Sequence, residues 1–145
     1  MDALDTKMLK LLQKNARITI SELSNELALS RPSVTERLHR LQEKGVIEEF
    51  TARVSLPALG RDILLIIMVS NLKVSPSEFE ELIRHDKAII ECHRVTGEVS
   101  YILKAAVSKM DSMRLLIDRL IPYGNINTST VLTSPVPYRH VLPLD

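Results

Sequence analysis

The stretch ITISELSNELALSRPSVTERLHRLQEKGVIEEF, residues 18–50, has the pattern of two short helices joined by a tight turn and followed by an extended segment. Thr19 and Glu22 have the spacing of a capping box, in which each side chain accepts a hydrogen bond from the other residue's backbone amide. Apolar residues then recur at helical spacing, namely Ile20, Leu23 and Leu27. This pattern predicts a first short helix with one buried face.

The second helix of this stretch has clear start and stop signals. Ser30 is a favoured N-cap residue, and Pro32 falls in the first turn, where its missing N–H does no harm. Gly45 stands at the position after the helix that favours a left-handed backbone. The apolar stripe of this helix consists of Val34, Leu38 and Leu41.

The flanking residues predict a third helix and a wing. Asp5 is expected to cap a helix upstream, with an apolar face made by Met8, Leu9, Leu11 and Leu12. After Gly45 the chain is rich in strand formers, namely Val46, Ile47, Phe50, Thr51 and Val54. Residues 1–54 are therefore predicted to form a winged helix-turn-helix domain.

The polar face of the second helix has the side chains to recognise a DNA groove. A helix turns by about 100° per residue, so the polar residues lie opposite the apolar stripe. Ser33 and Thr35 can donate or accept, Arg40 can pair with guanine or phosphate, and Glu36 can accept from a cytosine amine. Arg37 lies near the apolar boundary, which suits a phosphate or an intraprotein carboxylate. The predicted DNA contacts are Arg31, Pro32, Ser33, Thr35, Glu36, Arg37, His39 and Arg40. The alternative is an ordinary helical hairpin with a solvated charged face.

The second part of the chain follows a Pro- and Gly-marked connector, residues 55–61. Its pattern is strand (63–72), helix, strand (89–96), strand (99–107), helix and strand (126–133). Ser75 and Glu78 are expected to form a capping box for the first of these helices, and Ser108 is expected to cap the second. This order predicts an α+β chain in which a ferredoxin-like βαββαβ domain, residues 62–145, follows the winged helix.

The apolar residues of this domain predict self-association. Two right-handed crossovers place both helices on one face of the sheet. Residues 63–69 and 101–103 are nevertheless apolar at successive positions, whereas a strand with one face in water should alternate. The open face is therefore expected to pack against a second copy of the chain.

The charge balance is weak support for nucleic-acid binding. The 145-residue chain has a net charge of +1, and residues 1–54 hold nine basic and eight acidic residues. Because phosphate neutralisation supplies much of the affinity for DNA, one such unit should bind weakly. We expect an oligomer that adds several modest contacts.

Other classes of function have little support in the sequence. No secretion signal is recognised, and the apolar run at residues 63–69 is too short to span a bilayer. The single Cys92 excludes an internal disulfide, so we expect a cytoplasmic protein with no membrane association. No Gly-rich phosphate loop appears. The four histidines, His39, His85, His93 and His140, lack the spacing of metal ligands. We predict no catalytic residue, no metal and no cofactor.

The whole chain resembles the Lrp/AsnC (leucine-responsive and asparagine-type) transcriptional regulators of bacteria and archaea. That family opens on an L-D-x-x-D-x-x-I-L pattern, which the chain matches from Asp2 onward, with Met1 at the leucine. The remaining matches are Asp5, Met8, Leu9, Leu12, Arg17, Glu22, Leu23, Ser30, Val34, Arg37, Leu41, Glu43, Gly45, Ile47, Leu59, Gly60 and, more weakly, Gly97 and Tyr101. The resemblance implies a regulator that binds double-stranded DNA and assembles as a homodimer, often further into an octamer.

The resemblance also implies a small-molecule effector, usually an amino acid, near a G-x-x-D-Y segment at a subunit interface. Here Ser100 replaces the aspartate of that segment, and a serine offers only a neutral hydrogen bond to an ammonium group. This replacement leaves several alternatives open. The domain could bind a different effector, bind its effector with lower affinity or serve only in oligomerisation, and residues 96–101 could form a plain hairpin turn. The candidate effector residues are Thr96, Gly97, Glu98, Ser100 and Tyr101.

Two further functions are alternatives to a sequence-specific regulator. Sirohaem decarboxylases resemble the same pair of domains, and that activity would require His93 and Arg94 to face a tetrapyrrole. An architectural DNA-binding protein without an effector would follow curvature rather than a fixed sequence.

Overall fold

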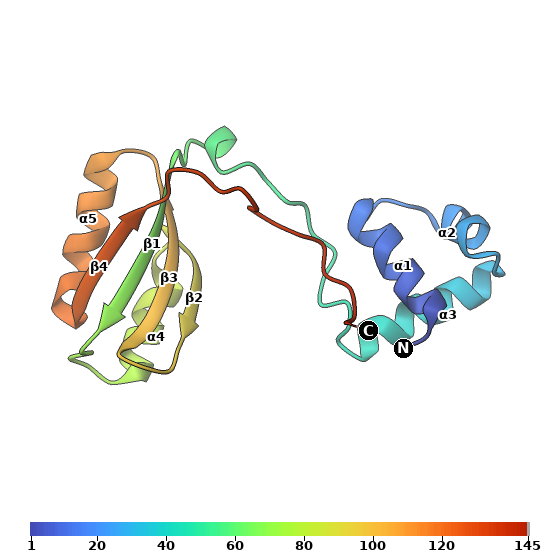
Figure 1. Ribbon diagram of the computed structural model, residues 1–145, viewed down its shortest axis with the longest axis horizontal. Helices are drawn as coiled ribbons and strands as arrows, with labels where there is room; N and C mark the ends of the chain where they lie inside the picture. The colour runs from blue at the N-terminus through green and yellow to red at the C-terminus, as the bar shows by residue number, and fades with distance from the viewer. Residues whose placement is uncertain (145) are drawn as a thin grey trace. The chain divides into compact units, whose positions relative to one another are not determined.

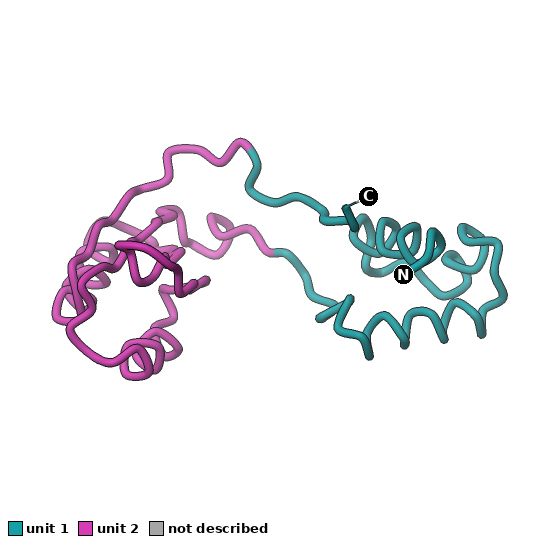
Figure 2. Tube along the Cα trace, turned by 60° about the horizontal axis from the view of Figure 1, so that its bottom comes forward, with its two compact units in different colours: residues 1–53, 136–145 teal, residues 54–135 magenta. Residues whose placement is uncertain are grey.

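The structure is a computed structural model that describes residues 1–144. The chain divides into two compact units, coloured separately in Figure 2. The first unit consists of Met1–Arg53 together with Val136–Asp145, and the second consists of Val54–Pro135. The first unit therefore combines two segments that lie far apart in the sequence, which the sequence did not suggest.

Three helices form the first unit: α1 (Ala3–Lys14), α2 (Ile20–Leu27) and α3 (Arg31–Glu43), as Figure 1 shows. One side of each helix is buried against the other two. The buried apolar residues that fill the centre of this unit are Met8, Leu9, Leu12, Leu23, Leu27, Val34 and Leu41. The helix-turn-helix predicted for residues 18–45 is thereby confirmed.

The caps of these helices are formed by local hydrogen bonds. The Thr19 amide donates to the Glu22 carboxylate at 2.7 Å and the Glu22 amide donates to the Thr19 hydroxyl at 3.2 Å, as the sequence predicted. Ser30 caps α3 as expected. The prediction for α1 was wrong by one turn: Asp2 is its N-cap, and Asp5 is the third helical residue of a capping box with Asp2.

The strands predicted for a wing are not formed. Gly45 adopts the expected left-handed conformation (φ 67°), and the amides of the next two residues donate to the Leu41 carbonyl. Residues 48–55, all described by the structure, then run without any strand pairing. Residues with strand propensity extend without a ladder when no partner strand lies beside them.

Residues 138–142 lie against other parts of the first unit instead. Gln13 of α1 donates to the Val141 carbonyl at 2.7 Å, and the Val141 amide donates back to the Gln13 side chain at 2.9 Å. Leu142 packs against the helical core. The Arg53 guanidinium lies 4.7 Å from the centre of the Tyr138 ring, within cation–π distance.

The second unit is a four-stranded antiparallel sheet with two helices. Its elements are β1 (Ile63–Ser70), α4 (Pro76–His85), β2 (Ile89–Arg94), β3 (Val99–Val107), α5 (Met110–Leu120) and β4 (Asn125–Thr130), and short 3-10 helices lie at Pro57–Leu59 and Ile121–Tyr123. The strand order is β2-β3-β1-β4. This order is that of the predicted ferredoxin-like βαββαβ fold.

The sheet has one covered face. Leu65, Ile67 and Val69 of β1 are fully buried among residues of α4 and α5, so both helices pack on the same face, as expected. The intervening residues of β1 belong to the opposite face because side chains alternate along a strand. These residues, Leu64, Ile66 and Met68, are half-buried.

Two predicted caps in this unit are incomplete. The Ser75 hydroxyl accepts from the Glu78 amide, but α4 lacks the reciprocal bond of a capping box. Ser108 does not cap α5: Lys109 is the N-cap residue without a side-chain bond, and the Ser108 hydroxyl lies 3.2 Å from that of Ser112. Across residues 1–144, every helix is too short or too polar to cross a membrane.

Candidate nucleic-acid interface

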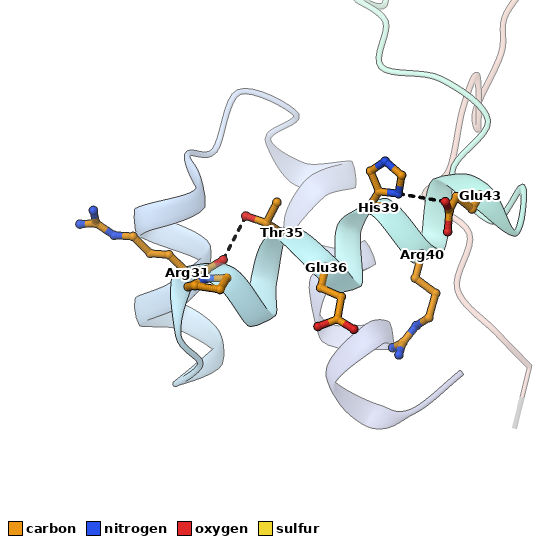
Figure 3. Close-up of a pocket in the computed structure, with 7 residues that line it drawn as sticks. Arg31, Thr35, Glu36, His39, Arg40 and Glu43 are labelled. Atoms are coloured by element: carbon orange, nitrogen blue, oxygen red, sulfur yellow. Dashed lines mark hydrogen bonds and ion pairs between the residues drawn. The ribbon is translucent and has the colours of Figure 1, made fainter.

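The outer face of α3 forms a shallow depression (Figure 3). Six of the eight predicted DNA contacts lie on it, and Glu43 extends it toward the end of the helix. Its lining residues are Arg31, Pro32, Thr35, Glu36, His39, Arg40 and Glu43. The face therefore holds three groups that can be cationic and two carboxylates.

Two of the predicted contacts are not part of the depression. The Ser33 amide donates to the Ser30 hydroxyl at 3.3 Å, and the two hydroxyls lie 2.9 Å apart, so Ser33 supports the helix cap. Nη1 of Arg37 donates to Asp2 Oδ2 and Asp5 Oδ1, both at 2.7 Å. An intraprotein carboxylate was one of the two partners predicted for Arg37.

The cluster formed by Asp2, Asp5 and Arg37 joins α1 to α3. Burial alone would raise the pKa of Asp5, but hydrogen bonds from the Asp2 amide and from Arg37 outweigh burial and lower that pKa. The Asp5 amide and Arg37 likewise lower the pKa of Asp2. Hydrogen bonds to both carboxylates raise the pKa of Arg37. All three groups are therefore charged near neutral pH.

The groups on the depression differ in how firmly they are held. The Thr35 hydroxyl donates to the Arg31 carbonyl at 3.0 Å, and His39 Nδ1 lies 3.2 Å from the Glu43 carboxylate (Figure 3). The Arg40 side chain is 42% exposed and reaches Asp5 at 3.3 Å. Glu36 is exposed on this depression, so its carboxylate is accessible to an external donor.

The predicted effector residues lie around the turn between β2 and β3. Thr96, Gly97 and Glu98 are exposed, and Ser100 is half-buried. The turn is closed by the Val95 amide, which donates to the Ser100 carbonyl at 3.0 Å. Gly97 has a φ of 106°, a conformation that L side chains rarely adopt.

Tyr101 is separated from these residues because its side chain enters the core. It is 1% exposed, and its ring centre lies 4.8 Å from that of Phe79. The Tyr101 hydroxyl donates to the Glu80 carboxylate at 2.7 Å. Burial and this neighbouring carboxylate raise the pKa of Tyr101 to about 12. In this structure Tyr101 supports the packing of α4 on the sheet.

Both units match known protein families. Residues 1–48 match the family described as winged helix-turn-helix DNA-binding, and residues 62–141 match the Lrp/AsnC ligand binding domain. The leucine-responsive regulatory protein of Haemophilus influenzae is 35% identical over 81% of this chain and 72% of its own length.

Solved structures agree with these sequence matches. LrpC from B. subtilis has a TM-score of 0.90 at 26% identity, over 95% of this chain and 99% of that one. A transcriptional regulator from Neisseria meningitidis, solved as a complex with L-Met, has a TM-score of 0.88 at 27% identity, over 97% and 96% of the two chains. The chain belongs to the Lrp/AsnC family, and it is a DNA-binding transcriptional regulator.

The acidic pair at the start of α1 is the part of the site that sequence reasoning did not identify. Asp2 and Asp5 were assigned to the family pattern and to helix capping, whereas both also bind a side chain of α3. The separation of 32 residues between Asp5 and Arg37 gives no local signal. The apolar boundary position of Arg37 was the only indication of such a partner.

Proposed function

We propose that the regulator contacts double-stranded DNA through the outer face of α3, in the cytoplasm. The observation that carries this proposal is the concentration of Arg31, His39 and Arg40 on one exposed face of the second helix of a helix-turn-helix. The second helix of this motif lies in the major groove, and its N-terminal residues contact base edges.

The groups on α3 suit two kinds of contact. Arg31 is exposed in the first turn, where a guanidinium can bind a phosphate or the O6 and N7 acceptors of guanine. Glu36 is exposed one turn further along and can accept from a cytosine amine. Thr35 keeps acceptor capacity after donating to the Arg31 carbonyl. We assign base reading to Thr35 and Glu36, and phosphate binding mainly to Arg40.

A comparison of two arginine variants tests this assignment. Arg40→Ala should weaken binding to a duplex of the regulator's own promoter, and it should lower the slope of log affinity against log salt by up to about 0.9 per α3. Arg114→Ala is the matched control, since Arg114 is an exposed, ion-paired arginine of α5. Equal affinity of the two variants in fluorescence anisotropy would count against the α3 interface.

We further propose that two copies associate through the open face of the sheet. In the register of the sheet, two rows of side chains cross this face. The first row is apolar in the two middle strands and polar at the outer strands, a pattern typical of an interface with an apolar centre and a polar rim. The second row is apolar only at Ile66 of β1, because Lys104 stands on the middle strand β3. The rows are His93–Ile102–Met68–Asn127 and Glu91–Lys104–Ile66–Ser129.

The charged groups of this face, including Lys104 of the middle strand β3, are already paired within one chain. Lys104 donates to Glu91 at 2.7 Å, and His93 lies 3.5 Å from the same carboxylate. A second copy could therefore cover the apolar centre without burying an unpaired charge. Met68→Asp should place a carboxylate in the centre and dissociate the assembly in analytical ultracentrifugation. Ser77→Asp adds the same charge at an exposed position of α4 and should leave the assembly unchanged.

The effector proposal is an amino acid bound near the turn between β2 and β3. The support is the Lrp/AsnC ligand binding domain itself and the L-Met complex of the related Neisseria meningitidis protein. Because Ser100 offers no negative charge to an ammonium group, the affinity should be modest. Calorimetric titration with each amino acid should identify the effector, and Ser100→Asp should tighten its binding. Absence of heat with all amino acids would refute the proposal.

A further inference from the structure

Asp5 has a second partner besides Arg37. Its carboxylate, on a residue that is only 4% exposed, also accepts from Nη2 of Arg40 at 3.3 Å. Arg37 and Arg40 lie three residues apart on α3, and both donate to Oδ1 of Asp5. Asp5 thus contacts both an internal arginine and an arginine of the proposed DNA interface.

The two contacts are unequal. Arg37 is bound at 2.7 Å by two carboxylates and its side chain is 20% exposed, whereas Arg40 is bound at 3.3 Å by one carboxylate and is 42% exposed. A charge-assisted hydrogen bond is strongest near 2.7–2.9 Å, so the Arg40 contact is the weaker one. A DNA phosphate that approaches α3 would therefore compete with Asp5 for Arg40 more easily than with Asp2 and Asp5 for Arg37.

From this geometry we propose that Asp5 is a positioning residue. In the free protein it binds the Arg40 guanidinium, and when DNA binds, Arg40 leaves Asp5 and contacts a DNA phosphate. This inference rests on the proposed DNA-binding face of α3. The paired carboxylate reduces the attraction of the free protein for any DNA backbone. Asp5 therefore lowers the sequence-independent part of the affinity, which depends on free cationic groups. Arg37 stays bound to Asp2 and Asp5 throughout and fixes α3 against α1.

The Asp5→Asn variant separates the two roles of this residue. An asparagine keeps an oxygen for the cap of α1, and Arg37 keeps its bond to Asp2. Arg40 loses its anionic partner. We expect binding to a duplex of random sequence to tighten by about threefold to tenfold at low salt, with a steeper salt slope. Asp118→Asn removes the same charge from the exposed Arg114–Asp118 pair of α5 and should change neither quantity.

A double-mutant cycle then assigns the effect to Arg40. If Asp5 acts through Arg40, Asp5→Asn should not tighten binding in the Arg40→Ala background. Tighter binding there would mean that the carboxylate acts as diffuse charge, and the proposal would be overturned. Weaker binding by Asp5→Asn, with an unchanged salt slope in a folded protein, would indicate a structural role alone and would also overturn it.

A measurement on the unmodified protein covers the case in which Asp5→Asn fails to fold. In arginine-labelled protein, the side-chain NMR signal of Arg40 should shift on addition of DNA, while that of Arg37 should not. The opposite pattern would refute the division of roles. If Arg40→Ala leaves DNA binding unaltered, the proposed interface itself fails. If Arg40→Ala weakens binding but Asp5→Asn does not tighten it, only the present inference fails.

Discussion

Leu23→Ala should strongly destabilise the DNA-binding unit and leave the stability of the sheet unit unchanged. Leu23 is 1% exposed, in a core of seven buried apolar residues that belong only to the first unit. Replacing a buried leucine by alanine costs roughly 2–5 kcal/mol, because the lost transfer energy adds to that of the cavity. A unit of roughly 60 residues has a total stability of about 3–9 kcal/mol. At the middle of the two ranges, about 3.5 of about 6 kcal/mol, the substitution removes more than half of this stability.

Leu116→Ala is the matched variant for the second unit. Leu116 is fully buried in the separate core between the sheet and its helices. Amide hydrogen exchange, read by mass spectrometry in peptides of α2 and of β1, reports on the two units separately. We expect Leu23→Ala to speed exchange in α2 alone and Leu116→Ala to speed it in β1 alone. Equal acceleration in both peptides by either variant would mean that the units unfold together, contrary to the two separate cores.

Three other predictions concern single hydrogen-bonded groups. The folded-state pKa values of Asp2 and Asp5 are lowered, so their contribution to stability is complete above the unfolded-state pKa of about 4 and is lost as pH falls through the folded-state pKa values. Urea unfolding of the helical unit at a series of pH values should show this decline, and a stability that is independent of pH down to about pH 2 would contradict it. Tyr101→Phe removes the hydroxyl that donates to Glu80 and should destabilise the sheet unit by about 1 kcal/mol in thermal unfolding. An unchanged stability would mean that water replaces the lost hydrogen bond to Glu80. Thr19→Ala removes one acceptor of the capping box and should cost about 1 kcal/mol by the same measurement, whereas Thr19→Ser should not.

The sequence predicted those parts of the fold that depend on local interactions. Thr19, Ser30 and Gly45 mark helix ends because a cap is formed within about three residues of the chain. The order of strands and helices in the second unit followed from apolar periodicity in the same way. Six of the eight predicted DNA contacts lie on one face because helical spacing alone determines which residues share that face.

The errors and omissions come from interactions between distant residues. The strand formers Val46 and Phe50 lack a ladder because strand structure requires a partner that propensity does not supply. The burial of Tyr101 was not foreseen either, because alternation along β3 turns its side chain toward α4. Its role in effector binding stays a prediction. The partners of Arg37 and Gln13 lie 35 and 128 residues away, beyond any local pattern.

The pairing of Gln13 with Val141 makes the sheet unit an insertion within the helical unit. In the chain, residues 54–135 are preceded and followed by segments of the helical unit, so folding of that unit closes a loop that contains the sheet unit. The entropy of closing such a loop grows only with the logarithm of its length, so the size of the insertion adds little to the cost. A fragment that ends at Arg53 would lack the two hydrogen bonds between the Gln13 side chain and the Val141 backbone, and also the packing of Leu142. Conversely, a single proteolytic cut in either connecting segment would leave the two units joined by the other.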